Sequence, residues 1–260
     1  MQIALVGDSI LDNGKYVSSG KCVSSHLNRL MCNYNVVLLA RDRSTVEDVI
    51  NQIESIPAGN GHVIISAGGN DALLAGKLLF TQCNSMMDAL SIWADEKDRF
   101  RTRYTHLLKQ LDKLKTNYCL CTIYEPPLSD PVTRRIMLTI LLFYNDTIMR
   151  MASERRKRVI DLRNVCIDPD HFANDIEPSD SGGLRIAASI AHAVDPEYQI
   201  DSRINRALKV CELIDFPHTS IIHRRLKISY INAKQLMNHL ILAGIVEEID
   251  EKYSLYMFII

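Results

Sequence analysis

The sequence predicts an α/β protein, a three-layer sandwich around a five-stranded parallel sheet, followed by a small second domain. Two observations support this prediction. Apolar runs alternate with segments of helical period from residue 1 to about residue 195, and the pattern changes character after Asp195-Pro196-Glu197. Strands that alternate with helices along a chain pair in parallel, with the helices covering both faces of the sheet.

Five short apolar runs are the predicted strands. They occupy residues 2–6, 35–40, 62–66, 118–124 and 158–162. The predicted helices lie near residues 21–33, 44–55, 85–116, 132–154 and 181–194. Five strands over this length fit a flavodoxin-like sandwich, in which the loops after the carboxyl ends of the strands form the ligand site.

The composition is that of an ordinary soluble globular protein. Of the 260 residues, 47% are hydrophobic and 23% are charged, and the formal net charge is −1. This charge provides no overall basic field for a nucleic acid, so such a partner would need a local patch. No apolar run approaches the roughly 18 residues of a membrane-spanning helix, and the chain opens on a strand rather than on a secretion signal. We therefore expect a cytoplasmic protein with no membrane partner.

The cysteine and glycine patterns predict no cofactor. Seven cysteines are scattered along the chain without a CxxC pair, a pattern that is more typical of small buried thiols than of metal ligands. Neither a GxGxxG motif nor a P-loop is found in the sequence. We expect no metal and no nucleotide cofactor.

Polar residues follow the ends of three predicted strands. Gly7-Asp8-Ser9 follows the first strand, residues 68–71 (GGND) follow the third, and residues 124–127 (YEPP) follow the fourth. Because the carboxyl ends of parallel strands lie at one edge of a sheet, we expect the three loops to converge there. Ser9 is then either a nucleophile or a polar residue that caps a helix.

A serine hydroxyl needs two kinds of help to act as a nucleophile. A base must take its proton, and N–H donors must stabilise the oxyanion that develops on the substrate. The candidate donors are the backbone N–H of Ser9, the backbone at Gly68-Gly69 and the side-chain amide of Asn70. Glycines at this place let a substrate approach the main chain closely.

The motifs GDSI (residues 7–10) and GGND (residues 68–71) resemble the first and third sequence blocks of the SGNH (GDSL) hydrolases. The resemblance implies an esterase or deacylase with Ser9 as its nucleophile and Asn70 as an oxyanion donor. The second block of the family, Asn-x-Gly after the second strand, is poorly matched, since Arg41 or Asp42 stands where the glycine is expected. Asp42 still has a backbone N–H to donate, although its carboxylate would oppose an anion.

The last block of that family, Asp-x-x-His, is altered in this chain. In NDIEPSDSGG (residues 174–183), Asn174 stands for the aspartate and Glu177 for the histidine, while the Pro-Ser and Gly-Gly frame matches. A carboxylate is about two pH units less basic than an imidazole, but burial raises its pKa. Glu177 is therefore one candidate for the general base, and His171, six residues upstream, is the other. The structural alternatives are a helix-entry carboxylate for Glu177 and a solvated loop histidine for His171.

Residues 200–260 are predicted to form a winged-helix domain, after a first domain of residues 1–196. An amphipathic helix over residues 201–215 precedes a helix, a turn, a second helix and a terminal hairpin, which is the outline of a winged helix. The segment SIIHRRLKISYINAKQLMNHLILAGIV (residues 220–246) resembles the winged-helix gamma domain of FtsK-type DNA translocases. That resemblance implies double-stranded DNA as a partner.

The residues expected to touch DNA lie at the turn and on the second helix. Basic side chains at the turn neutralise phosphates, and side chains at the start of the second helix reach base edges in the major groove. The candidates are Arg224, Arg225, Lys227, Tyr230, Asn232, Lys234 and Gln235. Residues 201–260 hold eight Lys or Arg against seven Asp or Glu, so binding would be modest and salt-sensitive. A winged helix that docks on a protein is the alternative.

The sequence thus predicts an SGNH-type serine esterase or deacylase that acts on a small-molecule or acylated substrate and carries a DNA-binding winged helix. The alternative function is ligand sensing, in which the pocket is kept without turnover and the winged helix acts as a switch on DNA or on a protein. The intact GDS and GGND motifs favour the enzyme, and the missing Asp-x-x-His favours the sensor.

Overall fold

The computed structural model describes residues 1–31, 33–57, 59, 61–195, 218–231, 233–234, 236–237, 246–250 and 255–258. The chain divides into two compact units, Met1–Val194 and Asp195–Ile260, which we call the first and the second unit. Among the described residues, no helix combines the length and the apolar character that crossing a bilayer requires.

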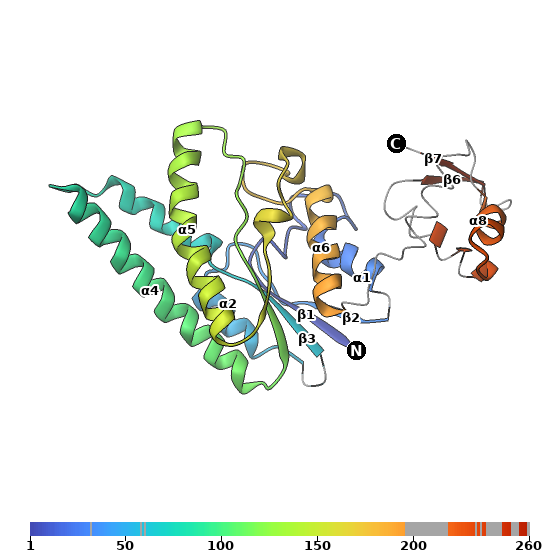
Figure 1. Cartoon of the computed structure of the whole chain (residues 1–260), viewed down its shortest axis with the longest axis horizontal. Helices are drawn as coiled ribbons and strands as arrows, with labels where there is room; N and C mark the ends of the chain where they lie inside the picture. The colour runs from blue at the N-terminus through green and yellow to red at the C-terminus, as the bar shows by residue number, and fades with distance from the viewer. Residues whose placement is uncertain are drawn as a thin grey trace. The chain divides into compact units, whose positions relative to one another are not determined.

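The first unit is built on one five-stranded sheet with the order β2-β1-β3-β4-β5 (Figure 1). Every neighbouring pair in this sheet is parallel. The strands are β1 (Gln2–Gly7), β2 (Asn35–Leu38), β3 (Gly61–Ser66), β4 (Asn117–Cys121) and β5 (Arg158–Ile160). This is the flavodoxin-like strand order, in which the chain reverses direction of winding between β1 and β3 and leaves a crevice at their carboxyl ends.

Helices cover both faces of this sheet, as the alternating pattern predicts. The helices are α1 (Val23–Leu30), α2 (Val46–Ile53), α3 (Gly69–Ala75), α4 (Met86–Lys113), α5 (Pro131–Glu154) and α6 (Asp180–Val194). Helix α1 packs against α6 on one face, and α2 packs against α4, which packs against α5, on the other (Figure 1). The three-layer α/β sandwich with a five-stranded parallel sheet is therefore confirmed.

The core follows from the alternation of side chains along each strand. In β1, Ala4 and Val6 belong to the main hydrophobic cluster together with Phe100 and Tyr104 of α4. Leu5, which lies between them and points to the opposite face, is also fully buried. A strand that buries both of its faces reads as a continuous apolar run, which is why β1 is conspicuous in the sequence.

Helix starts in the first unit carry recognisable caps. Thr45 and Asp48 form a capping box at α2, and Ser85 accepts the N–H of Asp88 at α4. Asp130 accepts the N–H of Thr133 at α5, with Pro131 at the first helical position. Each cap satisfies an N–H that the helix cannot bond internally.

Several segments differ from the sequence-based expectation, and β2 and β5 each end two residues earlier than predicted. Helix α3 and the 3₁₀ turn η1 (Gly76–Phe80) were not predicted, because seven and five residues are too few to show a helical period. Strand β4 ends at Cys121, three residues earlier than predicted. The side chain of Asn145 accepts the N–H of Ile123 and donates to its carbonyl, so these backbone groups do not bond to a neighbouring strand. The chain thus leaves the sheet where the predicted site begins.

The second unit contains two helical segments and one antiparallel pair of strands in its described part. Helix α8 (Thr219–Leu226) ends at Lys227, which takes a left-handed conformation with φ +53°. Residues 230–231, 233–234 and 236–237 are helical, and β6 (Val246–Asp250) pairs with β7 (Leu255–Phe258). The predicted helix over 201–215 lies outside the described residues. The winged-helix fold itself stays a prediction.

Candidate active site

The loops after β1, β3 and β4 meet around a small cavity of about 60 Å³. Ser9 and Asp8 come from the first loop, Asn70 from the second, and Tyr124 from the third. Glu177, from the loop before α6, also lines this cavity. The rest of the wall is mostly apolar and includes Ile10, Leu73, Ile123, Pro126, Leu128, Met137, Leu141 and Ile176. The predicted convergence of the three loops is confirmed.

Ser9 lies at the first turn after β1 and is 8% exposed. Gly7 has φ +149°, and a Cβ there would lie 2.0 Å from the carbonyl oxygen of Ser66 on β3. Only glycine fits this close approach of two strands. The N–H groups of Leu11 and Asp12 both donate to the carbonyl of Asp8, at 3.1 and 3.0 Å, which closes a helical turn around Ser9.

Asp8 is buried beside Ser9 and is held by neighbours on two elements. The hydroxyl of Ser66 donates to Asp8 Oδ1 at 2.8 Å, and the N–H of Ile10 donates to the same oxygen at 3.2 Å. Burial raises the pKa of Asp8 to about 7, although both hydrogen bonds act in the opposite direction. The charge of Glu177 adds to the rise.

Gly68, Gly69 and Asn70 have different roles at the start of α3. Gly68 is the N-cap residue with φ +117°, and a Cβ there would lie 2.9 Å from Cζ of Phe100. Gly69 and Asn70, rather than Gly68, line the cavity. The amide of Asn70 donates to the carbonyl of Ser44 at 3.0 Å, which orients the side chain from the β2–α2 loop.

The loop that carries Glu177 is fixed by three side chains. Asn174 Oδ1 accepts the N–H groups of Ile176 and Glu177, each at 2.9 Å. The hydroxyl of Tyr124 donates to the carbonyl of Ile176 at 2.6 Å, and the amide of Asn13 donates to the carbonyl of Pro178 at 3.1 Å. Asn174 thus shapes the turn on which Glu177 lies.

Glu177 has a perturbed carboxyl group. It is 6% exposed, and its Oε2 is buried without a hydrogen-bond partner among the described residues. Burial raises the pKa of Glu177, the side chain of Ser9 lowers it, the charge of Asp42 raises it, and the charge of Arg43 lowers it. The net direction is upward, toward the range in which a carboxylate is a useful base.

His171 lies elsewhere in the same loop region. Its Nδ1 accepts the N–H groups of Ile167 and Asp168, both at 3.2 Å, and the ring is buried. His171 does not line the cavity with Ser9. The imidazole therefore organises the turn before α6. The interpretation of His171 as a solvated loop histidine is wrong, because its ring is buried and bound to the backbone.

The β2–α2 loop differs from the arrangement that the sequence suggests. The N–H of Arg41 donates to the carbonyl of Gly7, and the N–H of Asp42 donates to Asp12 Oδ2 at 2.9 Å, so both are occupied. Arg43 instead has φ +67°, the conformation that favours glycine. Arg43 is thus the residue that stands in the glycine-like position, and no glycine in the sequence marks it.

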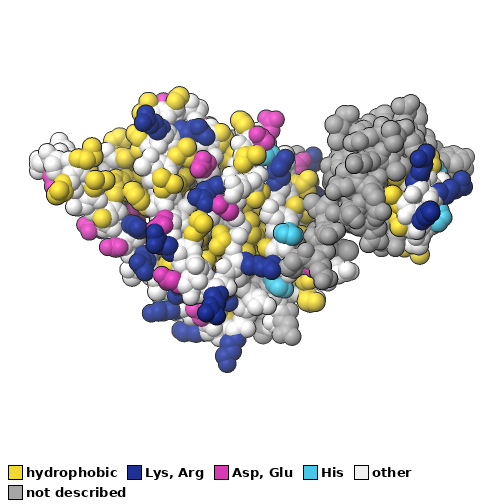
Figure 2. All heavy atoms as spheres, viewed as in Figure 1, with side chains coloured by type: hydrophobic (Ala, Val, Ile, Leu, Met, Phe, Trp, Pro, Cys, Tyr) yellow, Lys and Arg dark blue, Asp and Glu magenta, His cyan; other side chains and the backbone are white. Residues whose placement is uncertain are grey.

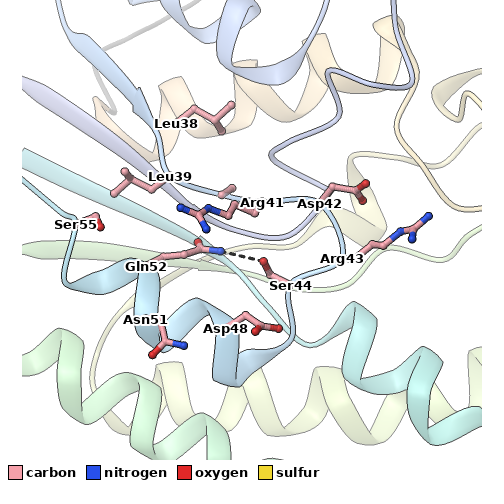
Figure 3. A pocket seen from close by; sticks show the side chains of 11 residues that line it. Leu38, Leu39, Arg41, Asp42, Arg43, Ser44, Asp48, Asn51, Gln52 and Ser55 are labelled. Carbon is pink, nitrogen blue, oxygen red and sulfur yellow. Dashed lines mark hydrogen bonds between the residues drawn. The ribbon is translucent and has the colours of Figure 1, made fainter.

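A larger cavity of about 470 Å³ lies along the same loop (Figure 3). Its lining runs from Leu38 to Ser44 and includes Asp48, Asn51, Gln52 and Ser55 of the α2 region. The side chain of Gln52 accepts the N–H of Gly7 and donates to the carbonyl of Gly7. It also donates to the hydroxyl of Ser44, which is the bond that the dashed line marks in Figure 3. This side chain supports the turn that carries Ser9. Ser9 and Glu177 line the smaller cavity and not this one.

The cysteines and acids of the described residues form no group of three that could hold a metal. Cys119, Cys121 and Cys166 are buried free thiols, whereas Cys83 is exposed. Cys32 and Cys211 lie outside the described residues.

The candidate DNA-binding residues of the second unit are described in part. Arg224 and Arg225 on α8, Lys227 at its end, and Lys234 are exposed, and Figure 2 shows Lys and Arg side chains on this surface. Tyr230 is 45% exposed and meets the ring of His223 edge-on, with the ring centroids 6.1 Å apart. Asn232 and Gln235 lie outside the described residues.

No family model and no curated protein matches the chain. Solved structures do match, among them a lipolytic protein of the G-D-S-L family from Veillonella parvula, with 17% identity, a TM-score of 0.56, and coverage of 73% of this chain and 95% of that one.

Two further matches are an extracellular lipase from Streptomyces rimosus and a psychrotrophic esterase from Pseudoalteromonas. The lipase is 14% identical, with a TM-score of 0.58 and coverage of 74% of this chain and 99% of its own. The esterase, solved in a form inhibited by monoethylphosphonate, is 14% identical, with a TM-score of 0.54 and coverage of 75% of this chain and 97% of its own. These structures give no support for a likeness of the second unit to FtsK. The first unit therefore has the three-layer α/β fold of the GDSL lipolytic hydrolases.

Proposed function

We propose that the first unit is a serine esterase or deacylase in which Glu177 takes the place of the usual histidine. The observation that carries the proposal is that Ser9, Asn70 and Glu177, from three separate parts of the chain, line one cavity. A nucleophile, an oxyanion donor and a base within one small space are the parts that acyl transfer needs.

In the proposed reaction, the hydroxyl oxygen of Ser9 attacks the carbonyl carbon of an ester. Its proton passes to the carboxylate of Glu177, which lines the same cavity as Ser9. The oxyanion is stabilised by an N–H of the Asn70 amide and by the backbone N–H of Ser9. The carbon–oxygen bond to the alcohol then breaks, the alcohol leaves with the proton from Glu177, and the acyl group stays on Ser9.

Water completes the cycle in the same geometry. Glu177 takes a proton from the water, the hydroxide attacks the acyl carbon, and the proton returns to Ser9 as the acid leaves. A carboxylate with an ordinary pKa is a weak base for this step. Burial moves the pKa of Glu177 upward, so that its proton affinity suits both halves of the reaction better.

A fluorophosphonate probe tests this proposal, because it forms a covalent bond only with an activated serine. We expect the wild type to be labelled, Ser9→Ala to be unlabelled, and Glu177→Gln to be labelled about 10²- to 10⁴-fold more slowly. His171→Ala is the matched control, since His171 lies outside the cavity lining. Folded wild type that takes no label contradicts the proposal.

The second candidate is a ligand-binding pocket without turnover. One observation favours it: the described lining of the cavity contains no imidazole. Under this reading, Ser9 and Asn70 bind an acyl compound through hydrogen bonds, and Ser9→Ala reduces binding without loss of any reaction. The labelling experiment separates the two candidates.

For the second unit we propose a DNA-binding winged helix, in line with the sequence resemblance. The support is the observed order of helix, turn, helix and antiparallel strands, with exposed Arg224 and Arg225 beside the turn. A mobility shift of double-stranded DNA at low salt is expected, and it should weaken in the double variant Arg224→Ala with Arg225→Ala. The absence of a shift at low salt favours docking on a protein. For the whole protein we propose a cytoplasmic location, and for the first unit a small-molecule or acylated substrate.

A further inference from the structure

We propose that Asp8 is a positioning residue whose carboxyl must carry a proton for Ser9 to react, so that Asp8 and Glu177 together hold a single negative charge in the active enzyme. This inference rests on the proposed function and deepens it, because it adds a second titrating carboxyl to the same site.

The geometry puts Asp8 at the side of the cavity where an oxyanion would form. Its Oδ1 is occupied by the hydroxyl of Ser66 and the N–H of Ile10. Its Oδ2 lies 3.6 Å from the position that a Cβ on Gly69 would take. Gly69 and Asn70 both line the cavity beside Ser9. A charge on Asp8 would therefore stand next to the negative charge that develops on the substrate.

Only one of the two carboxyls can usefully be ionised. Glu177 must be a carboxylate to accept the proton of Ser9. Asp8 is 1% exposed, and a second negative charge in the same cavity would oppose both Glu177 and the oxyanion with little screening from water. When two buried carboxyls share a site, the pKa of one is usually raised well above that of the other, so that one keeps its proton while the other is ionised.

Among the described residues, the groups that act on the pKa of Asp8 include no cation to offset its charge. The titratable groups that face it are Tyr104 of α4, Cys121 of β4, Tyr124 and Glu177. Burial raises the pKa of Tyr104, Cys121 and Tyr124, so all three stay neutral. The pKa of Asp8 itself is raised to about 7.

The groups that face Glu177 are different and include a cation. Asp42, Arg43 and Tyr16 interact with it from the β2–α2 and β1–α1 loops. Arg43 favours the ionised form of Glu177. Because Asp8 has no such partner, it is the member of the pair that keeps the proton.

This division predicts a bell-shaped dependence of the Ser9 reaction on pH. The rate rises as Glu177 loses its proton, and it falls as Asp8 loses its own proton near pH 7. The proton on Asp8 is not consumed in the reaction, since the proton of Ser9 goes to Glu177 and then to the leaving group.

The test is the rate of fluorophosphonate labelling of the full chain from acidic to alkaline pH. In Asp8→Asn, which cannot ionise, we expect the fall on the alkaline side to disappear. In Ser66→Ala, we expect this fall to move to higher pH, because the lost hydrogen bond had lowered the pKa of Asp8. Asp71→Asn is the matched control, since Asp71 is another buried aspartate on α3 that does not line the cavity. It should keep the wild-type profile.

A second measurement is independent of labelling. Carbon-13 NMR of labelled aspartate, assigned with Asp8→Asn, should show a carboxyl that titrates near pH 7. A resonance that titrates near the ordinary value for aspartate overturns the inference, as does an alkaline fall that persists in Asp8→Asn. Wild type that is unlabelled at every pH instead overturns the serine-hydrolase proposal, and the NMR titration still decides whether Asp8 carries the proton.

Discussion

The side-chain amide of Asn13 donates to the carbonyl of Pro178 over 3.1 Å, and its Oδ1 accepts the N–H of Val23 at 2.9 Å. Asn13 is fully buried. This one residue connects the loop after β1, which carries Ser9, to the loop before α6, which carries Glu177. A contact between residues 165 positions apart in the sequence therefore ties the loop of Ser9 to the loop of Glu177.

Asn13→Ala should slow the reaction of Ser9 even in the molecules that remain folded. It leaves a buried carbonyl and a buried N–H without partners, which costs about 1–3 kcal/mol for each unsatisfied group. The loosened Glu177 loop should slow fluorophosphonate labelling of the folded fraction. The control is Lys21→Ala, which removes an exposed ion pair with Asp180 and should change stability by less than about 1 kcal/mol. Equal labelling rates in the two variants would contradict this role of Asn13.

Glu177→Gln should be at least as stable as the wild type at neutral pH, although it reacts more slowly. The pKa of Glu177 is raised in the folded protein, so ionisation of this carboxyl favours the unfolded chain. That cost is absent below the pKa that Glu177 has in the unfolded chain, and it grows as the pH rises through the higher pKa that Glu177 has in the folded protein. Thermal unfolding of both proteins across this range should show a gap that opens with rising pH. A wild type that is clearly more stable at neutral pH would show that Glu177 is held by contacts that offset its burial.

Gly68→Ala should destabilise the first unit and disturb the Asn70 region. Gly68 has φ +117°, and its new Cβ would lie 2.9 Å from Cζ of Phe100, so strain of about 1–3 kcal/mol is expected from the backbone alone. Gly76→Ala is the control, because Gly76 has φ −52° and nothing within 4 Å of a new Cβ. Chemical denaturation should show a loss for the first variant and little change or a slight gain for the second.

His171→Ala should lower stability but leave the labelling rate of the folded protein unchanged. The imidazole accepts the N–H groups of Ile167 and Asp168, and their loss leaves two backbone donors unpaired. Burial lowers the pKa of His171, so protonation favours the unfolded chain. The stability that the wild type owes to His171 is present above the unfolded pKa and is lost as the pH falls. The stability difference between wild type and variant should therefore shrink in acid.

The strands and long helices were predictable because their signals are local. The apolar run at residues 2–6 buries both of its faces and so marks a central strand. Thr45 and Asp130 mark helix starts through the caps that they form. The motifs around Ser9 and Asn70 were predictable for a related reason, since each is short and follows a strand. Such features depend on neighbours within a few positions, which the sequence displays directly.

The choice between Glu177 and His171 was not predictable in this way. Both lie in one loop, six positions apart, and either spacing from Ser9 is compatible with the sequence. The loop turns through hydrogen bonds from Asn174, Tyr124 and Asn13, two of which come from distant parts of the chain. Those long-range contacts put Glu177 on the cavity and leave His171 to bind the backbone.

By itself, the sequence determined the order of strands and helices in the first unit, the strand ends at which Ser9 and Asn70 stand, and hence the edge of the sheet where a site forms. Only the tertiary structure decided that Glu177 rather than His171 lines the cavity with Ser9, that Asp8 shares this cavity, and that Arg43 takes the glycine-like conformation. The physical reason is that periodicity and capping act over a few residues, whereas burial and charge coupling depend on which distant loops the fold brings together.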